Sequence, residues 1–544
     1  MKRCLSFILV LCITVLSLPM TTLSVAGADY EDLYIGSFGY KPAVRYDENG
    51  NVVETGVRLK PDTNFSTMSV STLPASYDSR SKGYVTSVKN QGASSNCWAF
   101  AATSVLETNS IVNGYTKLSA TDFSEPHLTW FSYNTLTNDQ TDANYGDGIS
   151  IGAQVYQLGG DSDYVMRALT RWAGVADGRN VTSSYPTTTS QLSKLPTYTD
   201  ADRFDTSSGV IIRSMEECAT ADEVKQWIID NGSITASYYH DESSSYIKNG
   251  SNYVAYYYPV EGSYTNHMIA VVGWDDNFAA SKFNSANKPE GNGAWLCKNS
   301  WGSGWGNGSG YFWISYYDKS IRDFSGFVTQ PADKFDNNYT YNGSSYDCYI
   351  NESSSETIAN VFTAKYREDL TAISTYTANE NVTVNVRIYK NVSTDGTNGP
   401  ENGELAQSFT VNIPRKGYHT IDLPEAVSLE HGCVFSVVID ISVSSGHILV
   451  PIESGDDSAS IPGQSWIFKY GSWYTTERYC SQFDGKNLCI QAFSVTTCDH
   501  INQETVTKTY DDCSGQGYER IICLDCNGIL KETLYPRIAH TTGA

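Results

Sequence analysis

The sequence predicts an α+β fold class with at least two domains, and three observations indicate it. The chain has 544 residues, whereas a single hydrophobic core stops growing at roughly 250 to 300 residues. Apolar residues recur at helical spacing after Asn96, and beyond residue 262 short apolar runs separated by Gly, Asn and Ser replace them. From about residue 335 to 495 the pattern is β throughout, which is typical of a separate antiparallel sandwich.

The charge balance excludes two classes of partner. Sixty acidic residues against 37 basic ones give a formal net charge of −23, and no basic patch is evident. Such a surface repels phosphate groups. We therefore expect neither nucleic acid nor an anionic membrane surface among the partners.

Residues 1–28 carry the pattern of a secretory signal peptide. Lys2 and Arg3 precede an apolar run over residues 5–18, and Ala-Gly-Ala at 26–28 matches the small-residue pattern of a cleavage site. An uncleaved anchor is the alternative, but the run is shorter than the ~20 residues that span a bilayer. No later stretch is long and apolar enough to be a membrane helix. We expect a secreted, extracellular or cell-surface protein with no membrane span in the mature chain.

The number of cysteines predicts at least one thiol without a disulfide partner in the chain. Two of the 13 cysteines lie in the predicted signal peptide. The remaining number is odd, in a compartment where disulfides form. Cys97 is our candidate for the unpaired thiol.

The N-terminal part of the mature chain changes character at Leu73. Residues 29–72 are polar and irregular and end in the stretch NFSTMSVST, which indicates a linker or a short pro-segment. Further on, Ser-Ser-Asn at 94–96 supplies favourable helix N-caps, and Gly114 is suited to end a helix. Cys97 is therefore expected in the first turn of a helix. The residues expected on its apolar face are Trp98, Ala101, Ala102, Val105 and Val112.

A cysteine at a helix N-terminus is one half of a nucleophilic site, because the unpaired amides favour a thiolate. The other half is an imidazole. Five of the eight histidines lie in the predicted sandwich and tail, which leaves His127, His240 and His267. Of these, His267 immediately precedes a predicted strand, where it would be held rigidly. Asn299 follows the next predicted strand, and its amide oxygen could accept the ring N–H.

Three ordered blocks of sequence carry a family resemblance. LPASYDSR…VTSVKNQGASSNCWAF, NHMIAVVGWDD and GAWLCKNSWGSGWGNGSGYFWISYYD resemble the papain-like cysteine peptidases and together cover residues 73 to about 330. The resemblance implies a two-lobed fold, with a helical lobe beside a β-barrel-like lobe. It also implies a thiol peptidase that needs no cofactor for catalysis.

The resemblance implies a role for each site residue. Cys97 would attack the substrate carbonyl, His267 would act as base and then as acid, and Asn299 would orient the imidazole. Gln91 would donate its amide to the oxyanion together with the Cys97 backbone N–H; one such donor is typically worth ~10² to 10³ in rate. Pairing with histidine depresses a cysteine pKa to about 3 to 4, so a thiolate is expected at neutral pH. The substrate-binding residues would be Gly159, Gly160 and Trp301, the last also shielding the His267–Asn299 hydrogen bond from water.

Two departures from the family pattern bear on the site. Residues 94–96 stand where the family has a second cysteine and a glycine, so the disulfide that usually fastens this loop cannot form. The long inhibitory pro-region common in the family is absent, because only residues 29–72 separate the predicted signal from Leu73. How activity is restrained is open at this point.

Two C-terminal segments suggest further binding properties. Residues 335–495 resemble the lectin-like domain that follows papain-like peptidases in some secreted microbial proteins, which implies glycan binding; a packing or spacer role is the alternative. Residues 496–544 form a distinct Cys/His-rich module, for which a structural zinc ion and disulfides are competing accounts. The candidate ligands are Cys498, His500, Cys523 and Cys526, with Cys513 and His540 as further candidates.

These observations predict an exported papain-like cysteine peptidase with a peptidase domain at 73–330, acting on protein or peptide substrates. Peptide bonds would be hydrolysed through a thioester acyl-enzyme at Cys97, with His267 as acid and base. The alternative is a surface adhesin or glycan-binding protein whose peptidase module is inactive.

Overall fold

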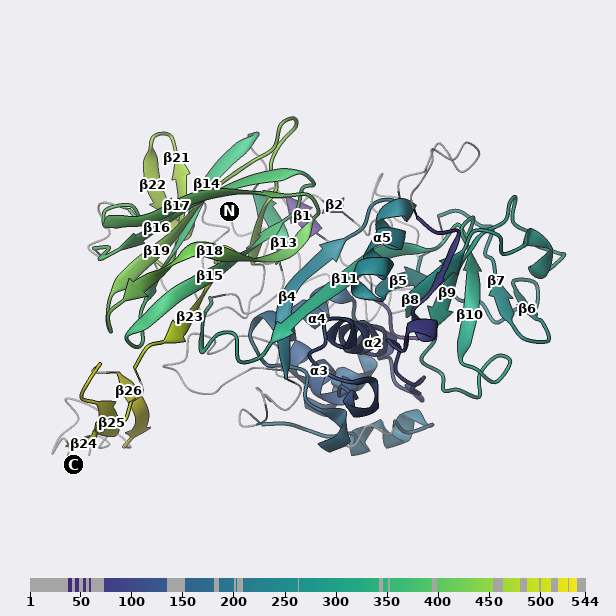
Figure 1. Cartoon of the computed structure of the whole chain (residues 1–544), viewed down its shortest axis with the longest axis horizontal. Helices are drawn as coiled ribbons and strands as arrows, with labels where there is room; N and C mark the ends of the chain where they lie inside the picture. The colour runs from purple at the N-terminus through teal and green to yellow at the C-terminus, as the bar shows by residue number, and fades with distance from the viewer. Residues whose placement is uncertain are drawn as a thin grey trace, which may run out of the picture.

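The computed structural model confirms the α+β class, with most of the α-helices gathered in one lobe and strands making up most of the rest (Figure 1). The predicted signal peptide and most of residues 29–72 lie outside the described residues. The structure describes residues 38–41, 45–47, 52–54, 58–59, 73–134, 152–180, 185–199, 202, 209–262, 264–341, 346–350, 353–393, 399–453, 463–479, 487–498, 500–509, 517–526 and 528–535.

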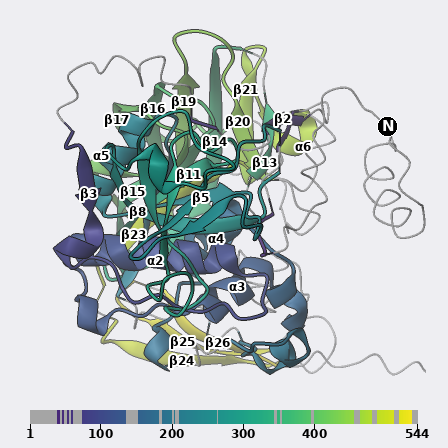
Figure 2. The ribbon, with the colours of Figure 1, turned by 90° about the vertical axis from the view of Figure 1, so that its right-hand side faces the viewer.

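The helical lobe is built around α2 (Cys97–Val112), which begins directly after Asn96 as predicted. Every residue of this helix from 97 to 110 is buried, so it is a core helix rather than the amphipathic one that the pattern predicts. It contacts α3 (Glu125–Tyr133) and α4 (Ser162–Thr170) on one side and strands of the second lobe on the other (Figure 2). The remaining helices are α5 (Ala221–Asn231) and the short α6 (Thr476–Tyr479).

The second lobe is a mainly antiparallel sheet that includes the strands predicted beyond residue 262. Its strand order is β4-β11-β5-β8-β9-β10-β7-β6, and β3 also pairs with β8. The central β8 is buried on both faces up to its last residue, because α2 packs on one side of it and α5 on the other. The strands are β3 (Ser76–Asp78), β4 (Val210–Glu217), β5 (Ile234–Tyr238), β6 (Ile247–Asn249), β7 (Val254–Tyr256), β8 (His267–Asp275), β9 (Ala294–Lys298), β10 (Tyr311–Ser315) and β11 (Arg322–Pro331).

The C-terminal sandwich consists of two facing sheets. One has the order β12-β23-β15-β18 and the other β17-β16-β19-β14-β21-β22. Alternate residues of β16 from Val382 to Ile388 are buried between them, as the period-2 pattern predicts. The strands are β12 (Asn337–Tyr339), β14 (Ser355–Thr363), β15 (Glu368–Thr377), β16 (Val382–Lys390), β17 (Glu404–Ile413), β18 (Gly417–Leu429), β19 (Val434–Ser442), β21 (Ser465–Lys469), β22 (Ser472–Thr475) and β23 (Ile490–Thr496).

The sandwich is joined to the peptidase lobe by continuous strand pairing, whereas the sequence predicts a separate domain. Strand β18 pairs with β4 through Gly417↔Glu216 and Tyr418↔Met215. Gly417 has φ 131°, and a Cβ there would lie 1.8 Å from the Met215 carbonyl oxygen, so only glycine permits this close approach. Hydrophobic periodicity carries no information about such pairing between distant strands, which is why the sequence did not predict it.

Parts of the segment 29–72 pair with both main bodies. Residues 38–41 lie against the peptidase lobes, where Tyr40 bridges to Gly160. Strand β1 pairs with β2 and, in parallel, with β13, which pairs with β20. The described parts of this segment therefore do more than link the predicted signal peptide to Leu73. These strands are β1 (Arg45–Asp47), β2 (Val52–Glu54), β13 (Tyr346–Ile350) and β20 (Val450–Glu453).

The tail is a separate three-stranded antiparallel sheet with the order β24-β25-β26, seen at the C-terminal end in Figure 1. Most of its side chains are exposed or half-buried. In the described part of the chain, no helix has the length and apolar character needed to cross a bilayer. The tail strands are β24 (Gln503–Lys508), β25 (Tyr518–Cys523) and β26 (Ile529–Leu534).

Candidate active site

Cys97 is the first residue of α2 and lies directly against strand β8 of the other lobe. Its Sγ accepts a hydrogen bond from the backbone N–H of Met268 at 3.4 Å. Met268 follows His267, the first residue of β8, so this bond fixes the thiol beside the imidazole. The helix start and the strand start thus meet at the boundary between the lobes.

His267 is held in one orientation by Asn299. The ring Nε2 lies 2.8 Å from the Asn299 Oδ1, which also accepts the backbone N–H of Ser300 at 2.8 Å. An amide oxygen only accepts hydrogen bonds, so the His267 Nε2 carries the proton. The ring Nδ1 is then an acceptor, and it has no hydrogen-bond partner in the described part of the chain. This is the tautomer that a base needs to take a proton from Cys97.

Trp301 covers the imidazole. Its ring stacks on that of His267 with centroids 4.5 Å apart and planes 19° from parallel. The indole thereby excludes water from the His267–Asn299 hydrogen bond, which strengthens the bond by lowering the local dielectric. This contact matches the shielding role that the resemblance implies.

Gln91 is held by hydrogen bonds where the family would have a disulfide. Its Oε1 accepts from the Ser300 hydroxyl at 2.7 Å, and its backbone N–H donates to the Ser300 carbonyl at 2.8 Å. Its Nε2 donates to the Ser94 carbonyl at 2.9 Å, and the Ser94 hydroxyl donates to the Gln91 carbonyl at 2.8 Å. Asn96 caps no backbone amide; its side chain donates to Thr129 and Tyr185, both at 3.0 Å. Residues 94–96 therefore fasten the loop without a covalent bond.

Lys89 anchors the chain just before Gln91, a role that the sequence did not suggest. Its Nζ lies 2.8 Å from the carboxylates of both Glu107 on α2 and Glu125 on α3. Both carboxylates are fully buried, and a buried charge needs such pairing. The three coulombic contacts, with Asp122 as the third, raise the pKa of Lys89 against its burial.

Residues 38–41, which we name the strap, lie in the cleft over this constellation. The Phe38 carbonyl accepts the second Gln91 Nε2 hydrogen at 2.9 Å. The Gly160 N–H donates to the Gly39 carbonyl at 3.0 Å, and the Lys41 N–H donates to the Gly160 carbonyl at 3.1 Å. A backbone carbonyl of the strap thus uses the donor predicted for the oxyanion.

The strap also covers the imidazole. The Phe38 ring lies 5.4 Å from that of His267 and 5.0 Å from that of Trp301, centroid to centroid. Gly39 has φ 105°, and a Cβ on it would lie 2.1 Å from the Ser95 carbonyl oxygen, so the strap passes too close to the loop for any other residue. Phe38 and Gly39 together close the cleft above Cys97.

Burial sets the charge state of the covered pair. It raises the pKa of the Cys97 thiol to about 12, although backbone N–H groups oppose it. It also lowers the pKa of His267 to about 4, although the hydrogen bond to Asn299 opposes it. Both groups are therefore neutral at pH 7 in this covered form. The sequence predicts a thiolate, and the structure differs because burial disfavours the charged form of each group more than the neighbouring donors favour it.

The two predicted substrate-binding glycines differ in what they contact. Gly160 pairs through both its N–H and its carbonyl with the strap. The Gly159 carbonyl instead accepts the Tyr133 hydroxyl at 2.7 Å, so this group faces the helical lobe. Gly160 is therefore the better placed of the two to bind an extended chain in the cleft.

Sequence reasoning missed several residues of the site. His240 lies beside it, with its ring 4.7 Å from Trp301 and 5.3 Å from Phe38. Ser300 fixes Gln91, and Asp323 accepts a hydrogen bond from Tyr40 of the strap. None of these stands in a local pattern that indicates a role, because each acts on a residue distant in sequence.

Comparison with known protein families agrees with the arrangement of these site residues. Residues 73–329 match the model of the papain family cysteine protease. This range contains Cys97, His267 and Asn299. Residues 73–329 are a papain-family peptidase domain. Residues 339–494 match the lectin like domain, so a lectin-like domain follows the papain-family domain. Both parts of the predicted resemblance are confirmed, the papain-like peptidase domain and the lectin-like domain.

Curated relatives agree with the papain-family domain but extend beyond it. A cysteine protease of Blomia tropicalis is 26% identical over 262 residues, which cover 47% of this chain and 66% of the relative. Ananain of Ananas comosus is 23% identical over 275 residues, covering 51% and 65%. Cathepsin K of Mus musculus is 28% identical over 265 residues, covering 46% and 65%. The chain thus spans just under two thirds of the length of these relatives.

Solved structures match the two domains together. The clostridial cysteine protease Cwp84 after propeptide cleavage is 25% identical, with a TM-score of 0.65, over 78% of this chain and 99% of its own. A second structure, of the cysteine protease and lectin-like domains of Cwp84, a surface layer associated protein of Clostridium difficile, is 23% identical with a TM-score of 0.64. It covers 82% of this chain and 91% of its own. Cwp84 and this protein therefore share a fold in which a lectin-like domain accompanies the peptidase domain.

Proposed function

We propose that this protein is an exported cysteine peptidase that hydrolyses peptide bonds through a thioester at Cys97. The observation that carries the proposal is the convergence of four side chains at the boundary between the lobes. The Cys97 thiol lies beside His267, Asn299 orients that imidazole, and Gln91 offers an amide to the same space. A module that served only as an adhesin would not need this arrangement.

The chemistry follows from the tautomer of His267. Its unprotonated Nδ1 takes the thiol proton as the Cys97 Sγ attacks the substrate carbonyl carbon, and the carbonyl oxygen becomes an oxyanion. The Cys97 backbone N–H and the Gln91 Nε2 are the donors for that oxygen. Collapse of the intermediate breaks the C–N bond, the imidazolium protonates the leaving amine, and a thioester remains. Water then gives a proton to His267, attacks the thioester, and releases the carboxylic acid and the thiol.

The strap would keep the peptidase latent until it is displaced. Its Phe38 carbonyl uses the Gln91 donor, and its backbone pairs with Gly160, where an extended substrate would lie. The solved structure of Cwp84 after propeptide cleavage shows that this two-domain relative has a propeptide that is removed. This proposal makes residues 29–72 a short pro-segment and answers how activity would be restrained.

Hydrolysis of a fluorogenic peptide library, with the strap removed by limited proteolysis, tests the proposal. We expect turnover from the processed protein, little from the intact one, and none from processed Cys97→Ala. Cys433→Ala is the matched control, because this half-buried thiol lies in the lectin-like domain, and it should keep full turnover. If the processed protein hydrolyses no peptide, the peptidase proposal fails.

Thiol labelling separates the peptidase from the adhesin alternative. In the processed protein, iodoacetamide should modify Cys97 far faster than the other thiols, because the His267 Nδ1 can take the thiol proton as the sulfur attacks. His267→Ala should slow that labelling. Equal, slow labelling of every cysteine would favour the adhesin with an inactive peptidase module.

Glycan binding by the lectin-like domain is a second proposal, and the family description alone supports it. A glycan array probed with the full chain carrying Cys97→Ala tests it without proteolysis of the array. Saturable binding to a defined glycan would support it. A blank array would favour the packing role that the β18–β4 pairing suggests.

A further inference from the structure

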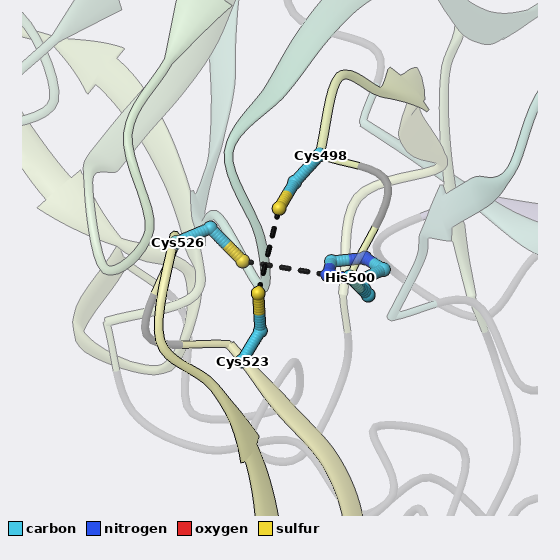
Figure 3. Close-up of side chains that lie close together, drawn as sticks. All are labelled: Cys498, His500, Cys523 and Cys526. Atoms are coloured by element: carbon cyan, nitrogen blue, oxygen red, sulfur yellow. Dashed lines mark hydrogen bonds between the residues drawn. The ribbon is translucent and has the colours of Figure 1, made fainter. Parts of the chain in front are cut away.

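A cluster of three cysteines and one histidine lies in the tail, far from the cleft. Cys498 and His500 precede β24, and Cys523 and Cys526 lie at the end of β25 and in the turn after it. Figure 3 shows their side chains pointing toward one common point, and the four ligand atoms lie within 4.8 Å of one another. The described part of the tail thus brings together the four candidates with metal-ligand spacing. The further candidates Cys513 and His540 lie outside the described residues.

The distances fit a metal site better than a disulfide. The Sγ atoms of Cys498 and Cys523 are 3.5 Å apart, and the Cys526 Sγ lies 3.5 Å from the His500 Nδ1. Around a tetrahedral zinc ion, bonds of about 2.3 Å to sulfur and about 2.0 Å to nitrogen place neighbouring ligand atoms about 3.5 to 3.8 Å apart. A disulfide needs two sulfurs about 2.05 Å apart. The cluster therefore has the spacing of a closed four-ligand site.

The tail has little else to hold it together. Its apolar core consists of the three cysteines, all buried, with the partly buried Leu530 packed against them. So small a sheet with mostly exposed side chains requires a metal, disulfides or another cross-link to be stable. Two loop hydrogen bonds shape the site, from Cys523 N–H to the Gly528 carbonyl at 2.9 Å and from Leu524 N–H to the Asn502 carbonyl at 2.8 Å.

We propose that Cys498, His500, Cys523 and Cys526 bind one structural zinc ion. Three thiolates and one neutral imidazole complete a tetrahedral set with no open position, which is typical of structural rather than catalytic zinc. Thiolate ligands favour zinc over the harder cations calcium and magnesium. The ion would fasten the start of β24 to the turn between β25 and β26, and so substitute for the missing apolar core.

Metal analysis of the full chain tests this site. We expect protein purified without reducing agent or chelator to contain one zinc ion per chain by native mass spectrometry. Cys526→Ser and His500→Ala should lose zinc, and Cys433→Ser, a thiol outside the cluster, should keep it. Removing zinc with a strong chelator should make the tail sensitive to limited proteolysis, and added zinc should restore its resistance. A zinc-free tail with Cys498–Cys523 or another cross-linked peptide in a non-reducing digest would overturn the proposal.

An independent observation concerns substrate selection in the cleft. Tyr40 of the strap is almost fully buried in a pocket beside Gly160. Its hydroxyl donates to the Asp323 Oδ2 at 2.5 Å, and the Ser237 hydroxyl donates to the same oxygen at 2.6 Å. Asp323 has φ 56°, an uncommon conformation for a residue other than glycine. The pocket therefore ends in an acceptor aimed at the phenol.

We infer that this pocket selects a tyrosine in the substrate residue that replaces Tyr40, an inference that rests on the proposed peptidase function. A phenylalanine would fill the same space but leave the Asp323 carboxylate without one of its donors. A buried acceptor that loses a donor is costly, and sites built to bind a hydroxyl discriminate strongly against analogues that lack it. A tyrosine substrate restores the hydrogen bond when the strap leaves.

A peptide library varied at each position before the cleaved bond tests the pocket on processed protein. We expect tyrosine to exceed phenylalanine in kcat/KM by at least about tenfold at one position. Asp323→Gly, which tolerates the positive φ, should bring that ratio close to one. Asn381→Gly is the matched control, because Asn381 has the same φ of 56° in the lectin-like domain. Active unaltered protein with no tyrosine preference overturns this inference alone, whereas no hydrolysis of any peptide overturns the peptidase proposal instead.

Discussion

The cleft and the tail both bring cysteine and histidine together, but for different chemistry. In the cleft, one thiol meets one imidazole from residues far apart in sequence, and Asn299 occupies the other ring nitrogen. In the tail, three thiols surround one imidazole, and all four residues lie between positions 498 and 526. A lone thiol beside an oriented imidazole can pass its proton to the ring and act as a nucleophile, whereas four converging ligands can enclose an ion.

What surrounds each cluster explains the difference. The cleft is held by two hydrophobic cores, one on each side of the lobe boundary, so it requires no ligand to keep its shape. In the described part of the tail, the apolar core is made of its own cysteines and one leucine. The same residue types therefore act as reactive groups where the fold is already stable, and as structural ligands where it is not.

The largest effect is expected from removing the base in the cleft. His267→Ala in processed protein should lower kcat by ~10² to 10⁴, because His267 is the group placed to take the Cys97 proton. His431→Ala, an exposed histidine of the lectin-like domain, should leave kcat unchanged. Steady-state hydrolysis of one fluorogenic peptide measures both. Unchanged turnover in His267→Ala would mean that the cleft pair is structural, like the tail cluster.

The oxyanion donor should rank next. Gln91→Ala is expected to lower kcat by ~10² to 10³, the usual loss for one such donor. The substitution also removes the Ser300 and Ser94 bonds to its amide, so circular dichroism should confirm that the variant folds. Gln226→Ala on the exposed face of α5 is the control. A loss confined to KM would contradict the oxyanion role.

Acid should loosen the strap. Burial lowers the pKa of His267 to about 4. The pKa of His240 lies well below its usual value, mainly because of burial and secondly because of repulsion from His267. Both rings contact Phe38. A histidine whose pKa is depressed in the covered form stabilises that form above about pH 6.5 and loses this contribution as the pH falls toward 4. The Cys97 pKa of about 12 lies outside this window.

Hydrogen exchange of the strap amides measures that effect. The exchange rate of the Lys41 backbone amide is first corrected for the intrinsic pH dependence of exchange. The pKa shift of His267 alone should then make that rate up to about tenfold faster at pH 5.5 than at pH 7. Phe38→Ala should exchange fast at both values, because the ring that covers the imidazoles is gone. Slower corrected exchange in acid would show that the strap is not coupled to these histidines.

The smallest effect should be that of zinc removal on the cleft. Chelation should leave hydrolysis of small peptides within about twofold, because the cleft has its own cores and no tail ligand lies in it. The Cys526→Ser variant should behave likewise. A large loss of activity, restored by zinc, would show that the two sites depend on each other.

Much of the cleft could be predicted from the sequence because its signals are local. The residues at 94–96 and the spacing after them predict a helix start at Cys97, and α2 begins there. The apolar run after Asn266 predicts a strand that opens with His267, and β8 does so. Helix starts and strand starts depend mainly on neighbouring residues, so a single sequence suffices to locate them.

The rest depends on contacts between distant segments. The pairing of the strap with Gly160, the Asp323 pocket and the β18–β4 pairing each join residues separated by more than a hundred positions. The neutral state of Cys97 and His267 likewise follows from burial under those contacts, whereas the motif alone predicts a thiolate. Local patterns carry no information about which distant backbone covers a site.

By itself, the sequence determined the α+β class and a Cys/His-rich tail, and it predicted the set of Cys97, His267, Asn299 and Gln91. Only the tertiary structure decided that hydrogen bonds from Ser94 and Ser300 hold Gln91 in place of a disulfide, and that Phe38 covers the site. It also decided which four tail residues converge. The physical reason is the same in each case: residue type and spacing set what a side chain can do, and packing sets which partner it meets.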